Sequence, residues 1–380
     1  MQLTWREVIA RRTTRHHLTS PGADPAGVTA AMCGAHAQIM SAAEVSVATR
    51  LDGATRVDVQ KALWTDRTLV KTHGPRGTVH LLPARDLGLW TGALKALPPA
   101  NTFAAGVRLT PGQIAEVAQA VDDALTTADD SLTIDELHTE VVARTGPWAG
   151  EKVMPAFQTL WPRWRQIVGS AATQGVLCFG PQRGRNVTYA SPARWSPGFT
   201  PWEPQAALTE LVRRYLWSYG PATPAHVARW LAAPPRLLTD VFTELSGELT
   251  QVTIDGEQLW LLAGDTVFDD APHGLRLLPY FDAYAVGSHP RHVVFPGRAS
   301  ERALAGGQAG NFPVLLIDGL AAGVWHQRLT GRRVAVTVEP LTPLSAANRA
   351  ALDEEVARLG RIHGATPTLT VGKVEVGAHA

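Results

Sequence analysis

Apolar positions along the first hundred residues follow a helical spacing first and a strand-like pattern afterwards. A capping box that begins at Thr4 and an Asp24-Pro25 pair predict the starts of two helices. Residues 56–64 have the apolar spacing of a further helix. Residues 68–72 and 78–82 then predict two strands with a basic turn between them. Helices followed by such a hairpin are typical of a winged helix.

This order of elements recurs twice along the chain. Helices predicted between residues 110 and 167 are followed by a hairpin, and so are helices predicted between residues 203 and 245. The three rounds share an order of elements and not a sequence, and they predict three tandem winged-helix modules. The expected hairpin strands are 176–180 and 186–190 in the second round, and 249–254 and 258–262 in the third.

The last hundred residues change character. Apolar runs on both sides of Asp318-Gly319 and at 332–341 predict strands, and Ser345 begins an amphipathic helix expected to reach Gly360. The whole chain is therefore predicted to be α+β. Its expected parts are winged-helix modules at 1–100, 101–200 and 201–270, and a β-rich C-terminal domain at 271–380.

Several local expectations accompany this organisation. Ser41 is expected to cap a helix that runs to Leu51. Asp282 is expected to be a structural turn carboxylate, and Trp325 a buried strand residue. Four tryptophans at helical spacing are expected to lie in the core: Trp161, Trp164, Trp217 and Trp230.

Composition fits a soluble globular protein, with 380 residues, 45% hydrophobic and 18% charged, and a net charge of +1. There is no apolar run of membrane-spanning length and no signal-peptide core, and Cys33 and Cys178 match no zinc or redox spacing. We therefore expect a cytoplasmic protein without membrane contact. Scattered histidines and the lack of a Gly-rich loop ending in Lys-Ser/Thr predict no metal and no cofactor.

His36 and Gln38 stand out in the small, apolar stretch 32–51, where the second helix is expected to end. At a helix end, side chains two residues apart can converge on one small object such as a water molecule. Histidine exchanges a proton near neutral pH, and glutamine can hold water through its amide. The alternative is a polar pair that simply ends a helix.

Six groups of segments in matching order then carry a resemblance. They are 32–51, Leu63-Trp64 with 67–70, 76–81, 220–223, 277–282, and 317–319 with 323–325. Together they resemble the winged-helix DNA glycosylases of the azinomycin-resistance type, the AlkZ/YcaQ-like group. The resemblance implies three tandem winged helices that form a curved cleft for duplex DNA, and excision of N7-alkylated purines. The family's motif of two glutamines flanking an apolar residue corresponds to His36-Ala37-Gln38, with histidine in first place, as in a branch resembling streptomycete self-resistance glycosylases.

The chemistry implied by this resemblance needs little acid catalysis. N7-alkylation makes guanine cationic and a good leaving group, so a positioned water and a stabilised sugar cation matter more. Gln38 is expected to orient the water, and His36 to accept a hydrogen bond or act as general base. The motif stretch has no lysine for Schiff-base lyase chemistry. Because bulky adducts hinder base eversion, the cleft is expected to act without flipping the base.

Basic residues near the predicted hairpin turns supply candidate phosphate contacts. They are Arg76 with Lys71 one strand away, and Arg183 and Arg185 in the second round. Arg291 lies in the segment 288–292, which is similar in position to the family's DNA-contacting hairpin. The alternative for each is a solvated turn arginine or, for Arg291, a loop between core strands.

These observations favour a monomeric, monofunctional DNA glycosylase, a hydrolase of the N-glycosyl bond. Its expected substrate is double-stranded DNA carrying bulky N7-alkylguanine adducts, with crosslinks as a further candidate, and its expected role is self-resistance to a genotoxic natural product. The rival is a non-catalytic winged-helix regulator or drug-sequestering protein. Regulators usually dimerise and read bases with polar helices, whereas this chain has no heptad run and residues 56–64 are only partly polar.

Overall fold

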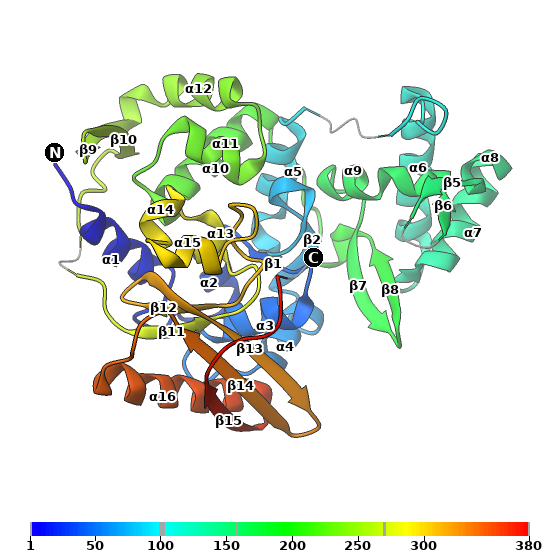
Figure 1. Ribbon diagram of the computed structural model, residues 1–380. Coiled ribbons are helices and arrows are strands. Elements are labelled where there is room, and N and C mark those ends of the chain that lie inside the picture. Colours follow the sequence, from blue (N-terminus) through cyan, green and yellow to red (C-terminus); the bar gives the residue numbers. More distant parts are fainter. Residues whose placement is uncertain (1, 99–102, 157–158, 269–270, 379–380) are drawn as a thin grey trace. The chain divides into compact units, whose positions relative to one another are not determined.

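The computed structural model describes residues 2–98, 103–156, 159–268 and 271–378. They form two compact units (Figure 1). Unit 1 comprises Met1–Thr65 and Val212–Ala380, and unit 2 comprises Asp66–Leu211. The sequence predicted four parts with boundaries at residues 100, 200 and 270. The division into two units does not test these boundaries, which stay a prediction.

The helices of unit 1 begin where the sequence supplies caps. Thr4 and Glu7 form the capping box of α1, and the Asp24 side chain accepts a hydrogen bond from Gly27 N at the start of α2. Both starts were predicted. The helices are α1 (Trp5–Arg15), α2 (Pro25–Ala31), α3 (Met40–Ala48), α4 (Arg56–Trp64), α10 (Pro204–Tyr219, which begins in unit 2), α11 (Pro224–Leu231), α12 (Pro235–Glu244), α13 (Ala283–Gly287), α14 (Arg291–Val294), α15 (Arg298–Arg302) and α16 (Ala346–His363).

A five-stranded sheet with the order β11-β12-β13-β14-β15 forms the C-terminal part of unit 1. Neighbouring strands are antiparallel except β14 and β15, whose parallel pairing requires a crossover. Helix α16 is that crossover, and it packs on β11, β14 and β15 (Figure 1). The strands are β11 (Leu275–Leu278), β12 (Val314–Ile317), β13 (Leu320–Thr330), β14 (Arg333–Pro340) and β15 (Thr366–Val371).

Unit 2 is built from short helices around a three-stranded sheet, β4-β8-β7. Its helices are α5 (Leu87–Lys95), α6 (Pro111–Thr127), α7 (Ile134–Thr145), α8 (Pro147–Gly150) and α9 (Val168–Thr173). Its strands are β2 (Leu69–His73), β3 (Val79–Pro83), β4 (Leu132–Thr133), β5 (Lys152–Pro155), β6 (Leu160–Pro162), β7 (Cys178–Arg183) and β8 (Asn186–Ala190).

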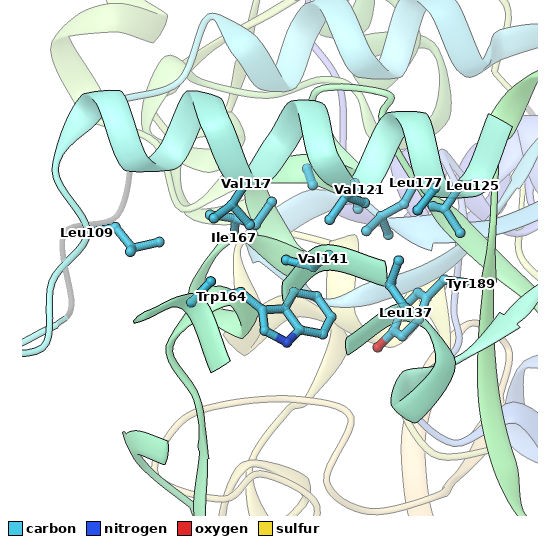
Figure 2. Close-up of a cluster of buried hydrophobic side chains, with 14 of the residues drawn as sticks. Leu109, Val117, Val121, Leu125, Leu137, Val141, Trp164, Ile167, Leu177 and Tyr189 are labelled. Atoms are coloured by element: carbon cyan, nitrogen blue, oxygen red, sulfur yellow. The ribbon is translucent and has the colours of Figure 1, made fainter. Parts of the chain in front are cut away.

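An apolar core holds unit 2 together. Figure 2 shows Trp164 and Tyr189 beneath the face of α6 that carries Val117, Val121 and Leu125. Trp164 is fully buried, and its indole N–H donates to His138 Nδ1 at 3.0 Å, so its one polar group is satisfied. Such an apolar cluster stabilises the unit by removing large side chains from water.

The three predicted hairpins are confirmed. β2 pairs with β3, β7 with β8, and β9 (Leu249–Ile254) with β10 (Glu257–Leu262), all antiparallel. In the last hairpin Asp255 and Gly256 have φ of 47° and 84°. Two successive positive φ angles give the tight turn expected of an Asp-Gly pair. With mostly antiparallel strands and separate helices, the chain is α+β, as predicted.

Some local predictions are wrong. Helix α3 begins at Met40 after Ile39, not after a Ser41 cap. Residues 160–162 form strand β6 followed by a 3-10 helix, Arg163–Ile167, so the expected helix there is absent. Trp161 and Trp217 are each 40% exposed, whereas Trp164, Trp230 and Trp325 are buried as predicted. Apolar spacing alone did not distinguish the exposed tryptophans from the buried ones. An arginine partly covers each exposed ring.

The segment 288–292 is not a hairpin. It links α13 to α14, which begins at Arg291. A hairpin was expected from position alone, and nothing in the sequence of this segment favours two paired strands.

Candidate active site

The turn between α2 and α3 carries the first candidate residues. Helix α2 ends at Ala31 and is capped by Met32. Cys33 and Gly34 follow with φ of 55° and 96°, which reverses the chain into the short strand β1 (Ala35–His36). The last carbonyls of α2 are bound by α10. Ser218 Oγ donates to Ala31 O at 2.7 Å, and Tyr219 Oη donates to Met32 O at 2.8 Å. The helix end is thereby fixed.

His36 and Gln38 differ in exposure. The side chain of His36 is nearly buried, at 8% exposure, whereas Gln38 is exposed and Ala37 between them is buried at 1%. The backbone is extended at Ala35 and His36 and bends at Gln38, so this segment is not helical. The turn therefore has an accessible amide two residues from an imidazole that is largely shielded from water.

Phe281 stacks on His36. Their ring centroids are 4.6 Å apart with an interplanar angle of 23°. Phe281 has a φ of 55°, rare for a bulky residue, and its N–H donates to Gly310 O at 2.8 Å. Gly310 has a φ of 103°, and a Cβ there would lie 2.9 Å from Phe281 Cδ1, so this position requires glycine. The stack restricts the orientation of the imidazole.

A buried ion pair fixes Phe281 relative to α3. Arg50 and Asp282 make two hydrogen bonds, of 2.8 and 2.9 Å, and both side chains have 0% exposure. Ser46 Oγ donates to the same carboxylate at 2.6 Å, and Tyr284 N donates to it at 3.0 Å. Asp282 thus starts α13 and connects it to the helix that follows Gln38. Its predicted structural role is confirmed.

Sequence reasoning missed Phe281. The segment 277–282 was quoted for the resemblance, but no role was assigned to its aromatic residues. A non-glycine residue with positive φ cannot be read from composition or periodicity. The pairing of residues 36 and 281 depends on tertiary structure.

The candidate phosphate contacts of the first two hairpins lie in unit 2. Lys71 is on β2, and its Nζ lies 5.0 Å from the centroid of the Phe179 ring. Arg76 is in the β2–β3 turn with a φ of 60°. Arg183 and Arg185 are exposed at the β7–β8 turn, where Arg183 also forms an ion pair with Glu136. The hydrogen bond from the Thr133 backbone N–H, together with those from Arg183 and the Thr133 side chain, lowers the pKa of Glu136 to about 2.

Arg291 lies in unit 1 and is tied to backbone. Its Nη1 donates to Ala285 O at 2.5 Å and to Ser288 O at 2.7 Å, and its Nη2 donates to Val286 O. These bonds satisfy carbonyls at the end of α13, so at least three of its five N–H donors are engaged within the protein. Arg291 therefore has a structural role that the sequence did not indicate.

Two features are absent from the described residues. No group of three or more His, Cys, Asp or Glu side chains there is arranged to hold a metal ion. No helix there is both long and apolar enough to cross a membrane.

Comparison with known proteins gives three agreeing results. The family model described as "DNA glycosylase AlkZ-like" matches residues 29–362. An interstrand DNA cross-link repair glycosylase of Streptomyces sahachiroi is 32% identical over 383 residues, which covers 96% of this chain and 98% of the relative. The solved structure of Streptomyces sahachiroi DNA glycosylase AlkZ has a TM-score of 0.81 at 31% identity and covers 98% of this chain and 100% of that chain.

These matches span nearly all of the sequence, the turn with His36 and Gln38 included. They also show that the chain is an enzyme of the class that hydrolyses N-glycosidic bonds in DNA. The chain therefore belongs to the AlkZ-like DNA glycosylase family.

Proposed function

We propose that this DNA glycosylase excises bulky N7-alkylguanine adducts, unhooks crosslinks built on them, and protects its producer from a genotoxic natural product. The observation that carries the proposal is the turn in which an accessible Gln38 follows an imidazole stacked on Phe281. Crosslinks are included because the relative from Streptomyces sahachiroi is described as an interstrand cross-link repair glycosylase. We further propose a monomeric, cytoplasmic enzyme that needs no metal or cofactor.

In the proposed mechanism, Gln38 holds a water molecule through its amide, and His36 accepts a proton from it. The water oxygen bonds to C1′ of the deoxyribose as the bond from C1′ to N9 breaks. The electron pair of that bond neutralises the cationic alkylguanine, which leaves. Since the base is already a good leaving group, orientation of the water supplies most of the rate acceleration.

We propose that three winged helices form a curved cleft that holds the duplex. Three hairpins, each preceded by helices, support this arrangement. The proposed phosphate contacts remain Lys71, Arg76, Arg183, Arg185 and Arg291, of which Arg291 also holds α13. The lesion is proposed to be cleaved without rotating into a pocket. A complex in which the alkylated base is everted into the protein would contradict that last point.

Excision is tested by incubating duplex DNA carrying an N7-alkylguanine adduct with the protein and cleaving abasic sites with alkali. Wild type is expected to produce strand breaks, and Gln38→Ala and His36→Ala are expected to lower the single-turnover rate by about 100-fold or more. Matched controls are Gln327→Ala and His363→Ala, a glutamine and a histidine of unit 1 whose Oε1 and Nε2 atoms lie 3.0 Å apart. These should retain wild-type rates.

The proposal fails if wild type binds adducted DNA but leaves no abasic site. That outcome would instead support the drug-sequestering or regulatory alternative. Equal loss of rate in the control pair would show that the effect of His36→Ala and Gln38→Ala is a general loss of structure.

A further inference from the structure

A basic recess lies in unit 1 between the segment that follows α3 and the last turns of α16. It has a volume of about 250 Å³. Three arginines line it, Arg276, Arg358 and Arg361, together with His17 and one carboxylate, Asp52. Neither His36 nor Gln38 lines it, so it is separate from the candidate active site.

The positive charge of the recess is only partly neutralised within the protein. The buried carboxylate of Glu355 is shared, with Oε2 lying 3.9 Å from Arg276 Nη1 and 3.7 Å from Arg358 Nη1. Burial lowers the pKa of Arg358, while Glu355 raises it and the positive charges of Arg276 and Arg361 lower it further. Three like charges held around one recess repel one another. A bound anion would relieve that repulsion.

The three guanidinium groups have different free donors. Arg358 Nη2 donates to the carbonyls of Thr49 and Leu51, so this guanidinium is held against the segment that follows α3. Arg276 Nη1 donates to its neighbour Leu275 O at 2.8 Å, but its Nε is buried and has no acceptor among the described residues. Arg361 is exposed, and within the described residues its side chain has no ion pair. Unused donors therefore remain on Arg276 and Arg361.

We propose that this recess binds a phosphate group, through Arg276 and Arg361, with Arg358 also lining the site. Arginine presents paired N–H donors that match phosphate oxygens, and a buried donor without an acceptor is costly unless a ligand supplies one. The phosphate belongs either to a DNA backbone or to a free phosphate. Helix α3 spans nine residues, about 13 Å at about 1.5 Å per residue. It separates the recess from Gln38, so a backbone phosphate bound here would lie a few nucleotides from the lesion.

The test measures binding of inorganic phosphate to the full chain by calorimetry, against chloride at equal ionic strength. Arg361→Gln and Arg276→Gln are expected to weaken phosphate binding about tenfold. Arg349→Gln is the matched control, because it removes one charge from the same helix, at an exposed residue that does not line the recess. It should bind phosphate as wild type does. Equal melting temperatures in chloride establish that each variant is folded.

A second arm identifies the source of the phosphate. Binding of unmodified duplex is measured over a range of salt concentrations for wild type and Arg361→Gln. A salt slope lower by about one in the variant assigns the site to the DNA backbone, and an unchanged slope assigns it to free phosphate.

The proposal is overturned if phosphate binds no better than chloride, or if Arg349→Gln weakens phosphate binding as much as Arg361→Gln does. Neither arm uses an excision assay, so the result is independent of the proposed glycosylase mechanism.

Discussion

The two units of this protein place their charges differently. In unit 1, Arg50 and Asp282 form an ion pair with no exposed side-chain surface. In unit 2, Arg183 and Glu136 form a pair in which each side chain is 46% exposed, and the core beneath is apolar apart from satisfied groups such as the Trp164 indole. Unit 1 thus has a fully buried ion pair besides exposed ones, whereas the ion pairs of unit 2 at Glu136, Glu140 and Glu151 all leave side-chain surface exposed.

The difference shows what each unit must hold in place. A buried ion pair is costly to desolvate, but its hydrogen bonds allow only one geometry. In unit 1 that geometry fixes α13 against α3, and with them Phe281 against His36. The turn of β7 and β8 in unit 2 carries the exposed arginines for which we propose phosphate contacts. An apolar core is sufficient to support the β7–β8 turn.

The largest expected effect is the loss of the buried ion pair. Asp282→Asn leaves Arg50 as a buried, uncompensated charge, and should lower the free energy of unfolding by about 3–5 kcal/mol. Denaturant titration measures the change. The control is Asp353→Asn. Asp353 forms an exposed ion pair with Arg349, with Oδ1 and Nε 3.7 Å apart, and its loss should change the free energy of unfolding by less than about 0.5 kcal/mol. Similar effects of both variants would remove the distinction between buried and exposed pairs.

Acid should destabilise the protein through two neutral histidines of unit 1, the half-buried His226 and the buried His289. Burial lowers the pKa of His226 to about 4 and that of His289 to about 2, from a usual value near 6.5. Below pH 6.5 the unfolded chain binds protons that the folded chain excludes. The contribution of these two histidines to the free energy of unfolding is therefore fully present above about pH 6.5. It falls towards pH 4, by up to about 1.4 kcal/mol per pH unit for each histidine.

Unfolding titrations at several pH values between 7 and 4.5 measure this dependence. His226→Gln should make the free energy of unfolding less dependent on pH. His292→Gln, at an exposed position, should leave that dependence unchanged. Parallel curves for wild type and His226→Gln would contradict the assignment.

Phe281 should affect excision more than stability. Phe281→Leu removes the stacked ring and should lower kcat/KM about 2- to 10-fold, since aromatic pairs contribute about 0.5–1.5 kcal/mol. Phe281→Tyr should restore the rate. An NMR shift of the His36 ring protons in Phe281→Leu, from loss of the ring current, reports the contact directly. Phe312→Leu, which removes a ring packed on Arg302, is the control. Unchanged His36 signals in Phe281→Leu would disprove the stack in solution.

The smallest effect is expected at the surface of unit 2. Arg185→Gln should weaken binding to modified and unmodified duplex alike and lower the salt slope by about one. Arg144→Gln removes a charge paired with Glu140 on α7 of the same unit and should leave the slope unchanged. If Arg185→Gln binds like wild type, the β7–β8 turn is a solvated surface.

Short-range features of this fold could be predicted from the sequence. The Thr4 capping box, the Asp24-Pro25 start of α2 and the Asp255-Gly256 turn all lie where the sequence placed them. Each depends on residues within about four positions of one another, so local backbone preferences suffice. The 160–162 segment was misjudged because its apolar residues fit a helix and a strand equally well.

The sequence by itself determined the hairpins, most helix starts and the two polar residues of the 36–38 turn. Only the tertiary structure decided that Phe281 covers His36, that Asp282 binds Arg50 from 232 residues away, and that Arg291 holds the end of α13. The first two of these contacts join residues far apart in the chain, and the third depends on α13, a five-residue helix that the pattern did not predict. Their geometry depends on how complete elements pack, which no local pattern encodes.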